Sequence, residues 1–314
     1  KEATGSMGDD TPTAVLSDLY RPFSHFFRQN FSQVTNPPID SLRENEVMSL
    51  KTRFGNTGNI LDFENLTKDN IYVLESPVLS NAQFEKFSYF FKKNIMLLDC
   101  TFDTKKSLRS RLDELCSEAE ISVREGKKHL ILSDRAVNEN KASIPMALAI
   151  GAINSRLVEL GIRGFASINV QAGEIMDTHS FAVLLGVGAT TINPYVAFDS
   201  IHQRYEKGLF GKISFEECAR RYIKSVDNGL LKIMSKMGIS VLSAYRGGCN
   251  FEAVGLSRSV IAKYFPGMIS RISGIGIAGI EKKIKKLHQK AFQKNISILP
   301  IGGIYKYRKN GETH

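Results

Sequence analysis

Three charged residues of the 314-residue sequence follow short apolar runs that we expect to be strands: Asp134, Glu174 and Arg246. In α/β proteins, the loops at the carboxyl ends of parallel strands usually hold the reacting groups. A carboxylate pair facing an arginine could carry out acid–base chemistry. The same residues could instead pair with each other or hydrogen-bond the loops between strand ends. We favour this structural interpretation, because residue order alone does not show which strands are neighbours.

A glycine pattern offers a second chemistry. Gly274-x-Gly276-x-x-Gly279 precedes a predicted helix and has the spacing that holds a pyrophosphate at a helix N-terminus. The sequence shows no convincing strand before it and no acidic residue about twenty positions further on, as the motif requires. The pattern is therefore more typical of a flexible loop that enters a helix.

Histidine and cysteine residues give weaker signals. His179 could act as a base on an exposed helix face, but a hydrogen-bonded helix residue is the commoner role, and His129 is expected to be structural at the start of a strand. Cys249 lies in a predicted loop without a nearby histidine to activate it. The four cysteines are far apart in sequence, which fits buried thiols in a reducing compartment and shows no metal or iron–sulfur spacing.

The elements that must position these residues alternate between strand and helix. Residues 164–200 contain strand, helix, strand and helix, which is the βαβα unit of a parallel sheet. The predicted fold class is α/β, a parallel-sheet or partial (β/α) barrel-like body with an irregular N-terminal arm. The five expected strands span residues 95–98, 129–132, 165–170, 190–192 and 239–242.

Helix-start signals and composition changes divide the chain further. We expect N-caps at Ser80, Thr104, Ser214 and Ser257, and helices over 22–31 and 280–292. Residues 1–60 are predicted to be the irregular arm, 61–295 the central α/β domain, and 296–314 a linker. The start at Lys1, without methionine, is typical of a piece of a longer polypeptide.

The net charge is +10, and much of it falls late in the chain. Lysines between Lys282 and Lys294 could bind nucleic acid. We favour a solvated helix face, because no aromatic residues are interleaved and no nucleic-acid motif accompanies them. No run of eighteen apolar residues occurs, so we expect no transmembrane helix.

Several sequence strings, in order, resemble the central region of the glutamate synthase large chain. The resemblance covers nearly the whole chain, so it is more specific than any single motif above. The strings are GSMGDDTPTAVLS (5–17), QVTNPPID (33–40), LILSDR (130–135), GATTINPYVAF (188–198), KIMSKMGIS (232–240) and FEAVGL (251–256).

The resemblance implies a multidomain enzyme. In that family, a glutaminase domain with an N-terminal cysteine releases ammonia. A channel carries the ammonia to an FMN barrel, where 2-oxoglutarate is aminated and reduced to glutamate. Electrons arrive through a 3Fe-4S cluster from NAD(P)H, by way of a small subunit, or from ferredoxin. The cofactors FMN and 3Fe-4S are thereby implied for the full-length chain and not for this segment, with a cytoplasmic or plastid location and no nucleic-acid or membrane partner.

The resemblance also implies a role for this segment, which joins the glutaminase and FMN domains. We expect no catalytic, cofactor-binding or metal-binding residue in it. Ammonia needs a path without strong acids that would trap ammonium, which small or neutral groups provide. Residues expected at the channel or at domain interfaces are Ser6, Met7, Gly8, Thr11, Asn36, Pro37, Pro38 and Asp40.

Two alternatives from other classes remain open at the level of sequence. One is a stand-alone barrel enzyme that binds a phosphate-bearing cofactor through the 274–279 glycines or through Gly302-Gly303. The other is a basic nucleic-acid-binding module that uses the lysine-rich helix at 282–294.

Overall fold

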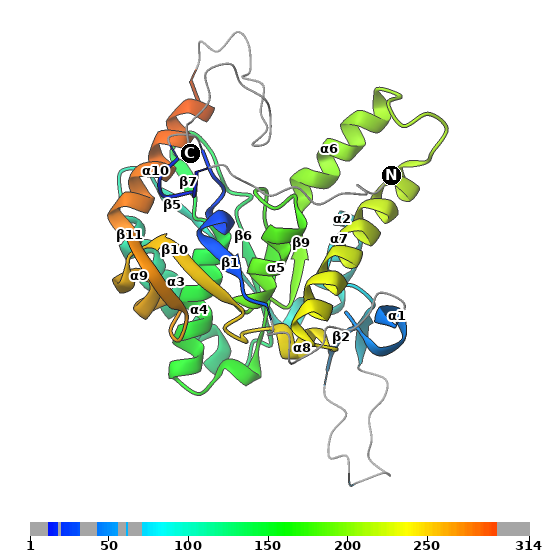
Figure 1. Ribbon diagram of the computed structural model, residues 1–314, viewed down its shortest axis with the longest axis horizontal. Helices are drawn as coiled ribbons and strands as arrows, with labels where there is room; N and C mark the ends of the chain where they lie inside the picture. Colours follow the sequence, from blue (N-terminus) through cyan, green and yellow to red (C-terminus); the bar gives the residue numbers. More distant parts are fainter. Residues whose placement is uncertain (1–11, 18–19, 32–42, 56–60, 62–70, 294–314) are drawn as a thin grey trace.

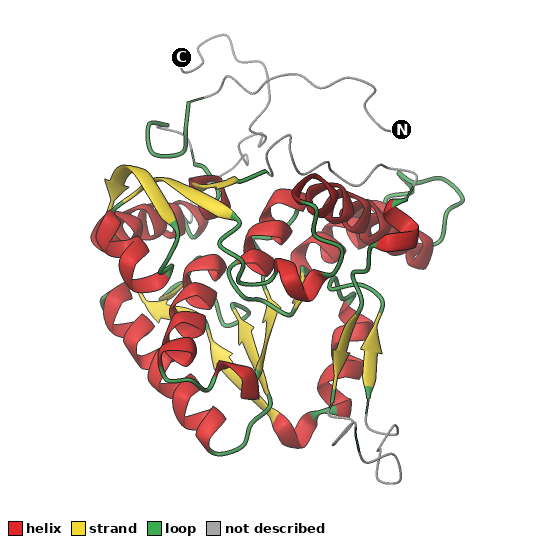
Figure 2. Ribbon diagram, turned by 60° about the horizontal axis from the view of Figure 1, so that its bottom comes forward, coloured by secondary structure: helices red, strands yellow, loops and turns green. Residues whose placement is uncertain are grey.

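The computed structural model describes residues 12–17, 20–31, 43–55, 61 and 71–293. At its centre is a four-stranded parallel sheet with strand order β4-β6-β8-β9 (Figure 2). The strands are β4 (Ile95–Asp99), β6 (His129–Ser133), β8 (Ser167–Gln171) and β9 (Thr191–Asn193). These strands confirm four of the five strands that the apolar runs predict.

The middle strand β6 is buried along its whole length because both faces of the sheet are covered. Leu130 and Leu132 point into the main core, which contains α3 (Leu108–Arg124) and α4 (Met146–Glu159). Ile131 points into a second core, built by β2 (Thr52–Phe54), β3 (Tyr72–Leu74) and α2 (Asn81–Phe90). This split follows from the two-residue side-chain period of a strand.

The sheet is open, and the described strands form no closed barrel. Beyond β9, Val78 forms a parallel bridge to Ile192, and the Leu79 backbone N–H donates to the Ile192 carbonyl over 2.8 Å. At the opposite edge, β4 pairs only with β6 among the described residues. The structure therefore agrees with the parallel-sheet form of the predicted α/β class.

Helices cover both sides of the sheet (Figure 1). On the side of the main core, α4 packs on α3, on α5 (Thr178–Gly186) and on α9 (Arg258–Tyr264), and α7 (Phe215–Met237) packs on α5 and on α6 (Tyr195–Glu206). Helix α2 lies on the other side of the sheet, in the second core. The caps at Ser80, Ser214 and Ser257 are confirmed, whereas α3 begins after Ser107 and not after Thr104. The remaining helices are α1 (Glu44–Val47), α8 (Leu242–Tyr245), α10 (Ile277–Ala291), and the short 3₁₀ turns η2 (Lys92–Asn94) and η3 (Arg163–Phe165).

The fifth predicted strand, at 239–242, is wrong. Gly238 ends α7 in the left-handed conformation, at φ 69°, and Val241 forms only an isolated bridge with Ser49. Leu242, the last residue of the run, and Tyr245 are then buried one helical turn apart in α8. The next strand is β10 (Phe251–Leu256), which belongs to a different sheet.

That second sheet has the order β1-β10-β11 and contains the described part of the N-terminal arm. The predicted helix at 22–31 is instead η1 (Phe23–Phe26) followed by β1 (Phe27–Gln29). Strand β1 runs antiparallel to β10, while β11 (Ile269–Ile275) runs parallel to it. Residues 27–29 form a strand because one edge of β10 supplies backbone hydrogen-bond partners for them. The helical spacing of the phenylalanines cannot show this long-range pairing. A further antiparallel pair is formed by β5 (Thr101–Asp103) and β7 (Lys141–Ser143).

His129 lies inside the second core, as its structural interpretation predicts. Its ring lies 4.1 Å from that of Phe91, and its Nδ1 lies 2.8 Å from the Ser167 hydroxyl. Burial lowers the pKa of His129 to about 4, from an ordinary 6.5. The folded protein thus keeps a neutral imidazole where the unfolded chain would already be protonated.

We predict a pH-dependent stability effect of His129→Gln. As the pH falls from 6.5 towards 4, the unfolded chain takes up a proton that folded His129 does not, so wild type loses stability. The free energy of unfolding of wild type relative to His129→Gln should therefore decline by up to about 1 kcal/mol per pH unit in this window. Urea unfolding at several pH values measures the difference. A stability difference between the two proteins that stays constant with pH would contradict the prediction.

Candidate functional site

The carboxyl ends of β6 and β8 bring two of the three predicted charged residues together. Asp134 follows β6, and its two carboxylate oxygens accept the backbone N–H of Gly173, after β8, over 3.2 and 3.0 Å. Ser143, at the end of β7, donates its hydroxyl to the same carboxylate over 3.4 Å. Burial raises the pKa of Asp134, and the Gly173 N–H partly offsets that shift. Asp134 thus fixes the loop after β8 to the end of β6.

Glu174 holds the start of a helix. Its Oε1 accepts the backbone N–H of Met146, the first residue of α4, over 2.6 Å. The N-cap residue Pro145 supplies no side-chain acceptor, so the carboxylate takes the place of an N-cap and faces the positive end of the helix dipole. Burial raises the pKa of Glu174 to about 7; the Met146 bond lowers it, and the charge of Asp134 raises it further. The structural role that we favoured for both carboxylates is confirmed by these bonds.

A cavity of about 410 Å³ opens beside these two carboxylates, and we call it the carboxyl-end cavity. The described N-terminal residues and α10 form its other walls, so sequence positions more than two hundred residues apart meet there. Strand-end signals predict only Asp134 and Glu174 of its lining, and the spacing of the α10 lysines indicates one further helix face. The N-terminal lining residues reach the cavity through tertiary contacts and have no such signal. Its lining comprises Ser17, Tyr20, Arg21, Phe23, Phe26, Asp134, Ser143, Pro145, Gly173, Glu174, Ile275, Ile280, Lys283, Ile284, Lys286, Leu287 and Lys290.

Arg246 does not join the two carboxylates, so the less favoured possibility of a carboxylate pair facing an arginine is not formed. It lies near Arg163, before β8, and the adjacent Gly247 N–H bonds to the Gly186 carbonyl at the end of α5. Arg163 donates to Asn154 Oδ1 over 2.6 Å and to the Gly188 carbonyl over 2.8 Å, whereas the buried Nε of Arg246 has no hydrogen-bond partner among the described residues. Burial lowers the pKa of both guanidinium groups, that of Arg163 to about 10.

The 274–279 glycines serve strand packing. Contrary to the sequence expectation, a strand does precede the helix, since β11 runs to Ile275 and contains Gly274. A Cβ on Gly274 would lie 2.0 Å from the Gly255 carbonyl oxygen of β10, so only a glycine fits between these strands. Strand packing thus accounts for the glycine at position 274 without a phosphate ligand. The other glycine pair of that alternative, Gly302-Gly303, lies outside the described residues.

The remaining candidates have structural partners or stand apart. His179 Nε2 lies 3.0 Å from the Ser24 carbonyl oxygen, which ties α5 to η1 and confirms the hydrogen-bonded interpretation. Cys249 is exposed at φ 52°, Cys100 and Cys218 are buried, and Cys116 is half-buried. Within the described ranges, no three His, Cys, Asp or Glu side chains group as metal ligands would.

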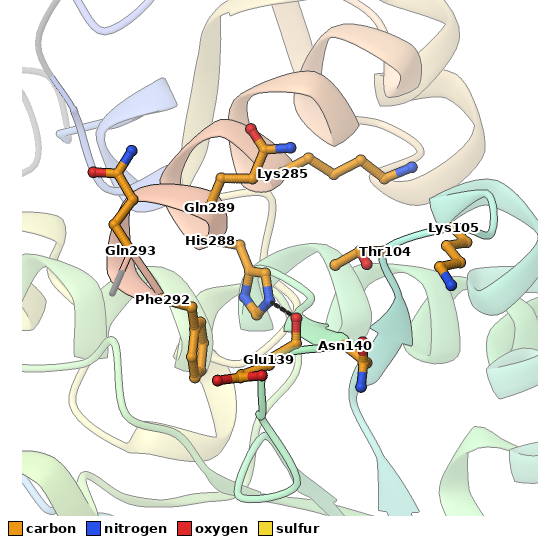
Figure 3. Close-up of a pocket in the computed structure, with 9 residues that line it drawn as sticks. All are labelled: Thr104, Lys105, Glu139, Asn140, Lys285, His288, Gln289, Phe292 and Gln293. Carbon is orange, nitrogen blue, oxygen red and sulfur yellow. Dashed lines mark hydrogen bonds between the residues drawn. The ribbon is translucent and has the colours of Figure 1, made fainter. Parts of the chain in front are cut away.

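A second cavity, of about 530 Å³, lies between the last turns of α10 and the loops around β5 and β7 (Figure 3). His288 and Phe292 reach it from α10, and His288 Nε2 lies 3.1 Å from the Glu139 carbonyl oxygen. The contact fastens the end of α10 to the loop before β7. The other lining residues are Thr104, Lys105, Asn140, Lys285, Gln289 and Gln293.

The positions expected at a channel or domain interface lie outside the described residues, so their roles stay predictions. They are Ser6, Met7, Gly8, Thr11, Asn36, Pro37, Pro38 and Asp40. In the described part of the chain, no helix is both long and apolar enough to cross a membrane. Lys282, Lys283, Lys286 and Lys290 of α10 are exposed, whereas Lys285 is half-buried and pairs with Glu281 over 2.6 Å.

Fold and site together define an α/β domain whose strand-end carboxylates hold its own loops and helix starts. The protein-family model described as glutamate synthase central domain matches residues 1–257 of this chain. The chain therefore belongs to the glutamate synthase central domain family, as its sequence strings predict.

Its curated relatives are much longer proteins. The chain is 53% identical to the glutamate synthase [NADPH] large chain of Azospirillum brasilense, with 100% of this chain and 21% of that protein covered. It is 39% identical to the glutamate synthase [NADPH] large chain of Bacillus subtilis (strain 168), with 100% of this chain and 21% of that protein covered. Against the chloroplastic ferredoxin-dependent glutamate synthase of Oryza sativa subsp. japonica, identity is 38%, over 100% and 20%. The chain thus spans about a fifth of the length of these relatives.

Among solved structures, similarity is weak. Inosine 5′-monophosphate dehydrogenase from Legionella pneumophila aligns with a TM-score of 0.32 and 12% identity, over 58% of this chain and 72% of that one. The flavin-binding domain of baker's yeast flavocytochrome b2 aligns with a TM-score of 0.38 and 10% identity, over 77% and 49%. Scores this low support no conclusion about this chain.

We predict that Gly274→Ala and Gly276→Ala differ sharply in stability. The Gly274 Cβ would collide with β10 backbone, whereas a Cβ on Gly276 has its nearest neighbour, Ser257 Oγ, at 3.7 Å. Gly274→Ala should lower the free energy of unfolding by more than about 2 kcal/mol, and Gly276→Ala by less than about 0.5 kcal/mol. Urea titrations of both variants measure this. Equal costs would contradict the packing role of Gly274.

A second matched pair tests the two arginines. Arg163→Met should destabilise by about 2–4 kcal/mol, because it leaves the Asn154 and Gly188 oxygens without their donor. Arg246→Met should change stability by less than about 1 kcal/mol, or raise it, because it removes a half-buried guanidinium whose Nε has no hydrogen-bond partner among the described residues. Thermal and urea unfolding report both. A large loss in Arg246→Met would show that its guanidinium has a stabilising partner.

Proposed function

We propose that this chain is the connecting domain of a glutamate synthase polypeptide and lies between a glutaminase domain and an FMN-binding domain. The whole polypeptide would convert glutamine and 2-oxoglutarate into two glutamates, in glutamate biosynthesis and ammonia assimilation. The observation that carries the proposal is the match along the full chain to relatives five times its length. Those relatives are named as glutamate synthases, which are oxidoreductases.

The geometry supports a framework role. Asp134 and Glu174 stand where a parallel sheet commonly places reacting groups, yet they accept hydrogen bonds from Gly173 and Met146. These bonds hold two loops and the buried helix α4 in one arrangement. A domain that keeps two active sites at a fixed separation needs this kind of rigidity. We therefore propose that this segment contributes no reacting group of its own.

The described residues do not fit the two cofactors that the family implies. The four cysteine side chains do not group together, so they cannot supply the thiolates of a 3Fe-4S cluster. Gly274, the first glycine of the pattern that could hold an FMN phosphate, packs against the Gly255 backbone instead. We propose that both groups, and the contact with a small electron-donating subunit or ferredoxin, belong to other domains of the polypeptide. A cytoplasmic or plastid location is proposed on the same basis.

Ammonia transfer is the finer part of the proposal. Residues 6–11 and 36–40 would face the neighbouring domains or the ammonia path between the two active sites. Neutral groups such as Ser6, Met7 and Gly8 would let ammonia pass, because a strong acid would retain it as ammonium. The stiff Asn36-Pro37-Pro38 passage would keep the wall of the path in place.

In the full-length enzyme, we predict that Met7→Glu uncouples the two half-reactions. An acid in the path should hold ammonium, so glutamine hydrolysis continues while glutamate formation from 2-oxoglutarate falls several-fold, by about 1 kcal/mol or more in effective barrier. The measurement is the ratio of the rate of glutamine hydrolysis to the rate of glutamate formation, together with the amount of free ammonia released into the medium. Met7→Leu keeps a neutral side chain of similar size and should stay coupled. Full coupling in a folded Met7→Glu enzyme would count against a channel role here.

A further inference from the structure

Strand β11 carries three isoleucines on one face of the small sheet β1-β10-β11. Ile269, Ile272 and Ile275 are three residues apart, a spacing that would turn them to alternating faces in a regular strand. The register between β10 and β11 shifts twice, so these isoleucines pair with every second residue of β10. Every second residue of a strand lies on the same face, and the paired residues of neighbouring strands share that face. The partners in β10 are, in order, Glu252, Val254 and Leu256.

The two faces of this sheet differ in what covers them. Phe251 and Ala253, on the inner face of β10, belong to the main core, and α9 packs on both β10 and β11. On the opposite face, Ile269 and Ile272 are 53% and 58% exposed, and Val254, the partner of Ile272, is half-buried. We call these last three residues the outer face. The inner face is part of the core, whereas the outer face exposes an apolar surface.

Strand β11 is therefore uncovered on two sides. A sheet that is apolar on both faces normally has a packed layer on each of them. In addition, β11 pairs only with β10 in the described part of the chain, so its other edge presents unpaired backbone groups. The strand is seven residues long and contains no proline that would protect this edge. In Figure 1, it lies on the outer side of β10. Both the face and the edge indicate that a further segment packs here.

The rim of the outer face carries an excess of positive charge. Arg28 of β1 pairs with Glu252 across 3.9 Å, and Arg271 pairs with the same carboxylate across 3.6 Å. The two arginine side chains are 75% and 78% exposed. One carboxylate balances only one of the two guanidinium groups, so this rim keeps a net charge of about +1. A carboxylate on a partner would complement it.

The position of the sheet in the chain indicates where its cover comes from. The glutamate synthase central domain family matches residues 1–257, so the match ends directly after β10, and β11 lies beyond it. The chain spans about a fifth of the length of its curated relatives, which therefore contain further domains. The sheet thus connects the last matched strand to sequence that follows the family's domain.

We propose that the outer face is the docking surface for the domain that follows this segment in the full-length polypeptide. That domain presents apolar side chains to Ile269 and Ile272, and a carboxylate to the arginines at the rim. The inference rests on the proposed connecting function, under which the following domain binds FMN. It deepens that function, because it names the surface through which the connecting domain holds its neighbour.

Thiol labelling of Ile272→Cys measures whether the outer face is covered. In the 314-residue chain, the introduced thiol should react with a maleimide at a rate within about threefold of that in Leu209→Cys, because Leu209 is 66% exposed. In the full-length polypeptide, the thiol at position 272 should react at least about tenfold more slowly than in the 314-residue chain. Peptide mass spectrometry distinguishes the introduced cysteine from the native ones.

A second set of variants tests the apolar character of the contact. In full-length Ile269→Cys, the thiol should be protected as at position 272. Adding Ile272→Asn should raise its labelling rate at least about fivefold, because an amide without a hydrogen-bond partner is costly in an apolar contact. The matched addition Ile272→Val stays apolar and should change the rate by less than about twofold. In the 314-residue chain, where position 272 is exposed, neither addition should change the rate by more than about twofold, with circular dichroism as the check of folding.

The outcomes separate the docking surface from the proposed function. Equal labelling rates of Ile272→Cys in the 314-residue chain and in a full-length polypeptide that makes glutamate would overturn the docking surface and leave the connecting role in place. Protection that develops in the 314-residue chain as its concentration rises from about 1 to about 100 µM would assign the outer face to a second copy and overturn the proposal. A full-length polypeptide that makes no glutamate from glutamine and 2-oxoglutarate would instead contradict the proposed function, whatever the labelling rates.

Discussion

The carboxylate of Asp134, which accepts the Gly173 backbone N–H, is the interaction on which the ordered end of the sheet depends. It joins the end of β6 to the loop after β8, and that loop carries Glu174 to the first N–H of α4. Because α4 is almost wholly buried between α3 and α9, its start fixes the position of the main core. Both carboxylates are desolvated, so loss of either hydrogen bond would leave an unpaired buried charge.

The two faces of β6 explain why this end of the sheet is well determined. Leu130 and Leu132 pack against the helical core, while Ile131 packs against the aromatic cluster around Phe87. A shift of one residue in β6 would exchange the two cores, which differ in size and shape. The register of the sheet is therefore set from both sides, and the positions of Asp134 and Glu174 follow from it. Such a frame suits a domain that connects others.

The glycine spacing at 274–279 arises at least at Gly274 from strand packing and not from phosphate binding. The spacing matched a phosphate-binding loop, and a strand does precede the helix. The decisive feature is the close approach of Gly274 to Gly255, where any side chain would meet backbone atoms. The motif identifies the glycine positions, and the neighbouring strand β10 explains why position 274 must be a glycine.

The sequence by itself determined the local elements and the family. Apolar runs with flanking turns placed β4, β6, β8 and β9, and serine caps placed the starts of α2, α7 and α9, because these signals act within a few residues. Tertiary structure decided the rest. The run at 239–242 formed no strand, and only Leu242 of it entered helix α8. Phe27 joined a strand because the edge of β10 supplied the backbone partners. It also separated Arg246 from the carboxylates and brought α10 over them to form the cavity, since contacts between distant segments leave no local periodicity to read.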